Sequence, residues 1–242
     1  MFQTVPVLGY NVAIASCEEA AQWCLKAIKN ERSQLLVTLN PEIIIQAESK
    51  PELKATLQRA ELTVADGVGV VWAAKQAGYR LPERVPGVEL VGRVLELGGQ
   101  DLRVFFLGAK PGIAEKAALE AQRRFGIQIA GIQHGYFDRE KESEQICQQV
   151  CETKPDLLLA GLGEGQELFL DNYRNTLNVP LMIGVGGTLD VLSGEVKRTP
   201  AWTHKWGLEW AYRVGLDPKR WHRFPRLLRF MQLVLVKEIV NR

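Results

Sequence analysis

An aspartate stands where an apolar segment changes into a helical pattern, in the stretch TVADGVGVVWAAK at residues 63–75. Near a helix N-terminus the carboxylate of Asp66 stays ionised, because the helix dipole favours an anion there. Such a carboxylate can accept a proton from a hydroxyl group held beside it. Aspartate is also a common helix N-cap, and the residues alone favour capping, a role that is compatible with catalysis.

Glycine-rich or polar segments follow each apolar segment, a pattern that suits binding of a phosphate group. Glycine lets backbone N–H groups come close to a ligand, and the N-terminus of the next helix favours an anion. In open parallel sheets ligands bind beyond the carboxyl ends of the strands, so these segments together suit a nucleotide diphosphate. Turn geometry explains each segment equally well when it is taken alone. The segments are TLNPE, ADGVG, LGAKPG, HGYF, GLGEGQ and VGGTLD.

A Rossmann-type oxidoreductase is the alternative function, and the residues support it poorly. The segment GLGEGQ begins as G-x-G, but its sixth position is Gln166, where the dinucleotide fingerprint needs glycine or alanine. The segment LGAKPG contains no G-x-G. Hydride transfer to or from a nicotinamide is therefore the weaker reading.

After a short N-terminal strand, the elements that carry these segments alternate between apolar strands and amphipathic helices. This alternation predicts a parallel sheet with helices on both faces, a Rossmann-like α/β core over residues 1–196. Ser16, with Glu19 three positions later, predicts a capping box, and Pro41 predicts the start of another helix. The spacing of the four cysteines does not suit zinc, so we expect free thiols.

Residues 197–242 have a different composition, and we place a boundary before them. This tail has 11 Lys and Arg against 3 Asp and Glu, a local net charge of +8, and holds four of the six tryptophans. Arginine and tryptophan together suit a nucleic acid or a phospholipid interface, and an amphipathic last stretch favours the membrane surface. We expect no nucleic acid as partner. One helix face carries Arg226, Arg229 and Lys237, and the other carries Leu228, Met231, Leu235 and Ile239.

No apolar run reaches the ~18–20 residues that a membrane-spanning helix needs. The first residues, MFQTVPVLGYNVAIAS, lack the basic start and the continuous apolar stretch of a secretory leader. We therefore expect neither a membrane span nor a leader.

Several multi-residue stretches resemble, in order, the motifs of the WecG/TagA/CpsF family of bacterial glycosyltransferases, from about residue 4 to about residue 225. The resemblance implies transfer of an N-acetylmannosamine-type sugar from a UDP-sugar donor to a GlcNAc-pyrophosphate-polyprenyl lipid. It further implies inversion, a β-1,4 linkage, and neither metal nor cofactor; no D-x-D follows a strand here. The stretches are TLNPEIIIQA, TVADGVGVVWAAKQAG, ERVPGVELV, FFLGAKPGIAEKAA, HGYF, GLGEGQE, VGGTLDVLSGEVKRTPAW, GLEWAYRV and PKRW.

The resemblance assigns the chemistry to four residues. Asp66 takes the place of the family's proposed base, which would deprotonate the C4 hydroxyl of GlcNAc. Thr38 and Asn40 would lie beside it and bind the donor sugar or the acceptor. Arg84 is expected to reach the diphosphate, since arginine pairs well with phosphate oxygens.

Four further residues are expected to bind substrate on the same grounds. Tyr136 would stack on uracil, and Asp190 would accept a hydrogen bond from the imide N–H. Gln166 and Gly108 match a polar position and a glycine-loop position of the family's site. Without the resemblance, Tyr136 reads as a loop aromatic and Asp190 as a helix-start carboxylate.

The tail matches the family's C-terminal appendage, which is thought to dock on the cytoplasmic face of the plasma membrane and close over the site. Arg213, Arg220 and Arg223 match its basic positions and would clamp a pyrophosphate. The expected location is therefore cytoplasmic and peripheral on that membrane. The sequence leaves open whether the protein is a monomer or a homodimer, and whether the donor sugar is a hexosamine or its uronate.

Overall fold

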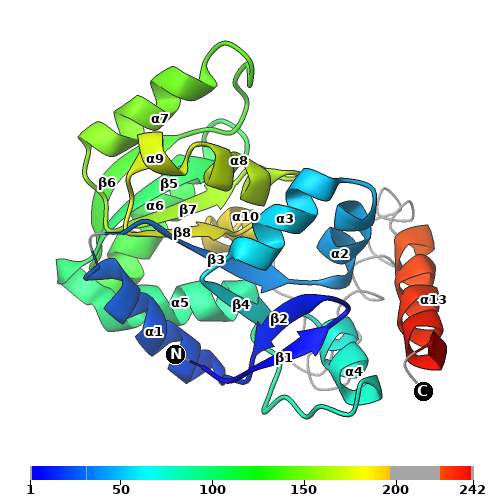
Figure 1. Ribbon diagram of the computed structural model, residues 1–242. Helices are drawn as coiled ribbons and strands as arrows, with labels where there is room; N and C mark the ends of the chain where they lie inside the picture. The colour runs from blue at the N-terminus through cyan, green and yellow to red at the C-terminus, as the bar shows by residue number, and fades with distance from the viewer. Residues whose placement is uncertain (1, 31, 197–223, 241–242) are drawn as a thin grey trace.

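A six-stranded parallel sheet forms the centre of the protein, in a computed structural model that describes residues 2–30, 32–196 and 224–240. The strand order is β4-β3-β8-β7-β5-β6 (Figure 1). This arrangement confirms the predicted α/β fold. The strands are β3 (Gln34–Leu39), β4 (Leu62–Ala65), β5 (Arg103–Gly108), β6 (Gln128–Gln133), β7 (Leu157–Gly161) and β8 (Leu181–Gly184).

Helices cover both faces of the sheet and bury the central strands almost completely. One face is covered by α1 (Cys17–Ile28), α5 (Gly87–Gly98), α6 (Ile113–Phe125) and α10 (Thr188–Leu192), with the short 3-10 helix η1 (Gly99–Asp101) after α5. The core of the other face includes α2 (Pro41–Glu48), α3 (Pro51–Arg59), α4 (Val68–Gln76), α7 (Ser143–Glu152), α8 (Gln166–Asn172) and α9 (Arg174–Leu177).

Local sequence signals account for the starts of α1 and α2. Ser16 and Glu19 form the predicted capping box of α1, with the Glu19 N–H donating to Ser16 Oγ at 3.2 Å and the Ser16 N–H donating to Glu19 Oε2 at 2.8 Å. Pro41 is the first residue of α2, as predicted, and fits there because that position needs no N–H donor. All four cysteines are free thiols.

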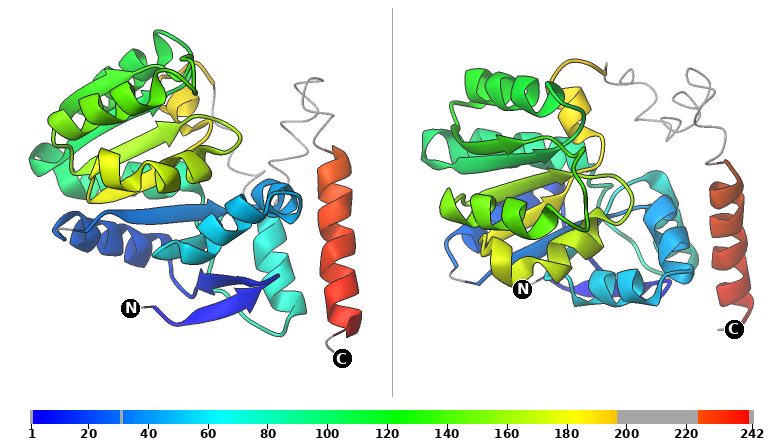
Figure 2. Two further views of the ribbon diagram at one scale, coloured as in Figure 1. Left: turned by 45° about the horizontal axis from the view of Figure 1, so that its top comes forward. Right: turned by 90° about the horizontal axis from the view of Figure 1, so that it is seen from above.

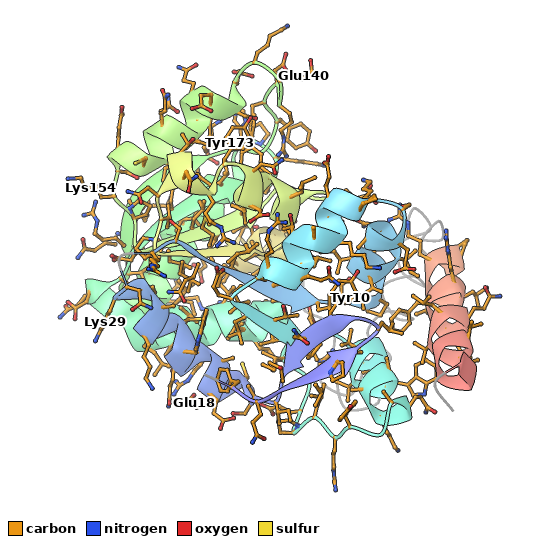
Figure 3. The ribbon with its side chains drawn as sticks, in the orientation of Figure 1. Tyr10, Glu18, Lys29, Glu140, Lys154 and Tyr173 are labelled. Atoms are coloured by element: carbon orange, nitrogen blue, oxygen red, sulfur yellow. The ribbon has the colours of Figure 1, made fainter. Side chains whose placement is uncertain are left out.

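The N-terminus is a two-stranded antiparallel hairpin, β1 (Thr4–Val7) and β2 (Tyr10–Ala13), rather than the single strand that the apolar pattern predicts. Leu8 and Gly9 form its turn, both with positive φ, which suits a tight hairpin. Tyr10, the first residue of β2 (Figure 3), is fully buried, and burial, with the nearby Glu48, raises the pKa of its hydroxyl to about 12. The hairpin is therefore part of the core.

A long C-terminal helix, α13 (Phe224–Val240), packs beside α2 and α4 (Figures 1 and 2). Phe230 and Val234 are its buried contacts, with 0% and 2% of their surface exposed. The described part of the basic tail therefore lies against the side of the core where β3 and β4 end.

Candidate active site

The carboxyl ends of the adjacent strands β3 and β8 are one place where the chain leaves the sheet toward opposite faces. After β3 the chain enters α2 on one face, and after β8 it enters α10 on the other. Adjacent parallel strands whose connections leave in opposite directions open a crevice, and ligands of α/β proteins bind there. The candidate site is therefore centred on the ends of β3 and β8 and on their neighbours β4 and β7.

Backbone hydrogen bonds fix the position of Asp66 directly after β4. Its N–H donates to the carbonyl oxygen of Leu39, at the end of β3, at 2.8 Å. The N–H of Val85 donates to the carbonyl oxygen of Ala65, also at 2.8 Å, so the loop that carries Arg84 runs along the end of β4. Asp66 and Arg84 are each half-buried at the same corner of the sheet.

The two glycines that follow Asp66 meet different structural requirements. Gly67 is the N-cap of α4 and has a φ of 97°, which L side chains rarely adopt. A Cβ on Gly69 would come within 2.5 Å of Pro41 Cγ and 3.2 Å of Phe230 Cε1. Gly67 therefore makes the turn, and Gly69 lets α4 pack against α2 and α13. The predicted N-cap at Asp66 is wrong by one residue, because Gly67 takes that position.

Thr38 and Asn40 lie at the end of β3, next to the strand that leads to Asp66. Thr38 is 9% exposed, and its Oγ1 lies 3.4 Å from where a Cβ on Gly87, in the first turn of α5, would be. Asn40 is the N-cap of α2, and its Oδ1 accepts from the N–H groups of Glu42 at 3.0 Å and Ile43 at 3.1 Å. Asn40 therefore caps α2, a role typical of asparagine directly before a helix-starting proline.

An open hollow of about 290 Å³ lies on the exposed side of α4, beginning two residues after Asp66. It is lined by Val68, Val71, Trp72, Lys75 and Arg84. Three apolar and two cationic side chains suit a ligand that joins an apolar chain to an anionic group. The sequence motif identifies Arg84. It does not single out Val68, Val71, Trp72 and Lys75, because α4 also has a buried face and the sequence alone does not show which of its residues face outward.

Gly108 and Tyr136 lie farther along the same edge. Gly108 ends β5 with a φ of 137°, and a Cβ there would lie 2.4 Å from the carbonyl oxygen of Gly161, so the close approach of β7 already requires glycine. Tyr136, 65% exposed, follows the edge strand β6. Asp190 lies in the first turn of α10, after β8. With about 4.8 Å between strands, the ends of β6 and β8 are about 14 Å apart, so neighbouring strands do not bring Tyr136 and Asp190 together.

Gln166 and Glu167 form a buried pair at the start of α8. The Gln166 Nε2 donates to Glu167 Oε1 at 2.8 Å, and the N–H of Gly186, after β8, donates to Gln166 Oε1 at 3.1 Å. Burial raises the pKa of the Glu167 carboxyl, although its hydrogen bond from Gln166 acts in the opposite direction. The motif GEGQE points to Gln166 but not to Glu167, because a glutamate at a helix start reads as solvent-exposed.

Arg226 joins α13 to two segments at the carboxyl edge. Its Nη1 lies 3.0 Å from Glu42 Oε1 in the first turn of α2 and 2.6 Å from Glu164 Oε1 in the β7–α8 loop. The helical projection places Arg226 on a basic surface face and does not identify these partners. Leu228, Met231 and Leu235 are 46%, 43% and 49% exposed, respectively. The predicted pyrophosphate clamp, Arg213, Arg220 and Arg223, lies outside the described residues.

Comparison with known proteins identifies a family. The sequence model of the glycosyl transferase WecG/TagA/CpsF family matches residues 5–242. A relative from Bacillus spizizenii (strain W23) is 34% identical over 214 residues, which cover 87% of this chain and 82% of the relative.

Two further relatives extend this similarity. One from Bacillus subtilis (strain 168) is 31% identical over 84% of this chain and 80% of its own length. One from Staphylococcus aureus (strain NCTC 8325) is 33% identical over 85% and 81%, respectively. All three relatives are named N-acetylglucosaminyldiphosphoundecaprenol N-acetyl-beta-D-mannosaminyltransferase.

Proposed function

The chain belongs to the WecG/TagA/CpsF family of glycosyl transferases, and we propose that it transfers N-acetylmannosamine, or a related hexosamine or uronate, from a UDP-sugar to a lipid. The acceptor is a GlcNAc joined through a diphosphate to a polyprenyl chain, the substrate type in the relatives' names. The product is a disaccharide on the same lipid, an early unit of a cell-surface polysaccharide.

The observation that carries the proposal is the position of Asp66. Its carboxyl group follows β4 at the carboxyl edge of the sheet, and Arg84 is held alongside through the hydrogen bond between Val85 and Ala65. A carboxylate at this edge of the sheet can act as a base on a hydroxyl group close to where a diphosphate binds.

In the proposed mechanism Asp66 takes the proton from the C4 hydroxyl of the acceptor GlcNAc. The resulting oxygen nucleophile attacks the anomeric carbon of the donor from the face opposite UDP. The bond from that carbon to the diphosphate oxygen breaks as the new one forms, so the configuration inverts and a β-1,4 linkage results. Arg84 and backbone N–H groups offset the negative charge that develops on UDP, without a metal ion.

The remaining predicted residues are assigned to substrate binding. Thr38 and Asn40 would bind a sugar next to Asp66, and Gly108 and Gln166 belong to the loops that surround the diphosphate. Asp190 would accept from the uracil N–H and Tyr136 would stack on its ring. Because β6 and β8 are not neighbours, Tyr136 and Asp190 can contact the same uracil only if the loop after one of these strands extends along the sheet edge. Arg213, Arg220 and Arg223 would hold a pyrophosphate from the tail.

We also propose that residues 197–242 attach a core of residues 1–196 to the cytoplasmic face of the plasma membrane. The exposed apolar side chains Leu228, Met231 and Leu235 support this proposal, because they lie on a helix whose other side is anchored in the core. In the described part of the chain no helix is long and apolar enough to cross a bilayer. A homodimer is compatible with the proposal but is not needed for it.

Product analysis tests this function directly. The full chain would be incubated with a panel of UDP-sugars and a short-chain GlcNAc-diphosphate lipid, and the products weighed by mass spectrometry. We expect addition of one N-acetylhexosamine, with an unchanged rate when a chelator replaces magnesium. If no UDP-sugar reacts, the proposed function is wrong; if magnesium is required, the metal-free mechanism is wrong.

The oxidoreductase alternative is tested by ligand protection. Thermal melting in the presence of UDP or NAD distinguishes the two, because a ligand that binds the folded state raises the melting temperature. We expect stabilisation by UDP and none by NAD, and the reverse result would favour hydride transfer.

A further inference from the structure

Glu167 carries the one carboxyl group among the buried residues of the described chain, with 5% of its surface exposed. Removing a carboxylate from water is unfavourable unless hydrogen bonds replace its hydration. Here the hydrogen-bond donor is the neutral carboxamide of Gln166 rather than a cation. A side chain so costly to bury is expected to have a specific role at its site.

The hydrogen bonds form a chain from Glu167 to the β8–α10 loop. A carboxylate can only accept, so Glu167 fixes the amide nitrogen of Gln166 toward itself. The amide oxygen then faces away and accepts from the N–H of Gly186 at 3.1 Å. Gln166 is 7% exposed, so both ends of its amide are used inside the protein.

The end of β8 is shaped to admit this pair. A Cβ on Gly184 would lie 2.6 Å from Glu167 Oε1 and 2.8 Å from Gln166 Nε2, which is closer than real contacts allow. On the neighbouring strand, a Cβ on Gly161 would lie 2.9 Å from the carbonyl oxygen of Gly186. The loop after β8 is therefore held by Gln166 and by close packing on β7.

We propose that Glu167 is a positioning residue for the donor site. Through Gln166 it holds Gly186, and with it the loop that leads to Asp190. The inference rests on the proposed transferase function, in which Asp190 contacts the uracil. Glu167 itself touches no substrate and acts on the donor site only through Gln166 and the loop that Gln166 holds.

Four variants of the full chain test the proposal. Glu167→Leu and Gln166→Leu each break the chain of hydrogen bonds, and the double variant removes it completely. Glu167→Gln keeps the shape and an acceptor oxygen for Gln166. Glu144→Leu, at an exposed glutamate on α7, is the matched control.

The first measurement is amide hydrogen exchange of peptides that cover residues 184–190, followed by mass spectrometry. We expect exchange about tenfold faster in Glu167→Leu and Gln166→Leu, because the loop opens more often. Glu167→Gln and the control should stay close to the unaltered protein. Unchanged exchange in both leucine variants would overturn the proposal. If Glu167→Leu does not fold, Gln166→Leu and Gly184→Ala provide the same test.

The second measurement separates the KM for the donor from kcat. Displacement of the donor loop should raise the donor KM about tenfold in each leucine variant, with the acceptor KM unchanged. The double variant should lose no more than either single one, because the two residues act in series. Multiplicative losses would contradict the proposal. Faster exchange in a protein without transferase activity would support the positioning role and refute the proposed function instead.

Discussion

Asp66 and Glu167 are two carboxyl groups at the same edge of the same sheet, yet their surroundings differ. Asp66 follows β4 and is half-buried, two residues before Val68, which lines an open hollow together with Arg84. Glu167 follows β7, is 5% exposed, and has the amide of Gln166 as partner. Position at the carboxyl edge therefore does not define the role of an acidic residue.

Access to ligand and solvent is the difference that matters. A base must meet the hydroxyl that it deprotonates and must release the proton afterwards, which Asp66 can do from its half-buried position. The carboxyl of Glu167 is enclosed, so its hydrogen bond serves to orient a neighbour.

The largest effect is expected from Asp66→Asn. The amide keeps the size of the side chain but cannot accept the proton, so turnover should fall by about 100-fold or more. UDP affinity, measured by calorimetry, should remain within a few-fold of the unaltered protein. Asp101→Asn, at an exposed aspartate before β5 and thus at the opposite edge, is the control. An unaltered turnover in Asp66→Asn would remove Asp66 from the mechanism.

The pH dependence of stability should distinguish Glu167 from an exposed glutamate. Because burial raises the pKa of Glu167 in the folded state, the folded protein holds this proton more tightly than the unfolded chain does. Its contribution therefore favours folding at low pH and weakens as pH rises from the ordinary glutamate value toward the folded pKa. The Glu167→Gln variant should not show this loss of stability as the pH rises.

Denaturant unfolding at a series of pH values between 4 and 8 measures this effect. The unfolding free energy of Glu167→Gln, relative to the unaltered protein, should rise with pH. If the difference in unfolding free energy between the two proteins stays constant with pH, burial does not disfavour the charged form of Glu167.

Two glycine substitutions compare a crowded position with an open one. Gly184→Ala places a methyl group against the Gln166–Glu167 pair and should destabilise the protein by about 1–3 kcal/mol. Gly92→Ala, in α5 with no atom within 4 Å of the added Cβ, should stabilise it by up to about 1 kcal/mol. Denaturant unfolding measures both. Equal effects of the two would show that the pair yields to the methyl group without strain.

The smallest effect is expected from Arg226→Gln. Arg226, Glu42 and Glu164 are 35%, 30% and 49% exposed, so solvent screens their attraction. Losing the two ion pairs should cost about 0.2–1 kcal/mol in the unfolding free energy, and less at high salt. Phe230, which is fully buried, should keep α13 in place. If the amide hydrogens of α13 lose their protection from exchange in Arg226→Gln, the ion pairs hold the helix in place.

Periodicity and turn signals predict the sheet, most helices and the placement of Asp66, because apolar strands and glycine turns leave a strong local pattern. The N-terminal hairpin is missed, since its two strands read as one apolar stretch interrupted by Leu8 and Gly9. The buried face of α13 is also missed. Both of its sides carry apolar residues, and only the contacts of Phe230 with α2 and α4 decide which side faces inward. Glu167 escapes prediction because its burial depends on how α8 packs against the end of β8 at Gly184, which the local pattern does not show.

The turn that holds Asp66 has a consequence for reading mutational data. Gly67 is required by a backbone angle and Gly69 by the space that Pro41 and Phe230 leave, so no side chain satisfies both demands. A saturation scan scored by transferase activity would rank both glycines beside the catalytic residues, although neither offers a reactive group. Scoring the same library for protein abundance would separate them from Asp66, whose loss should leave the amount of protein unchanged while abolishing its product.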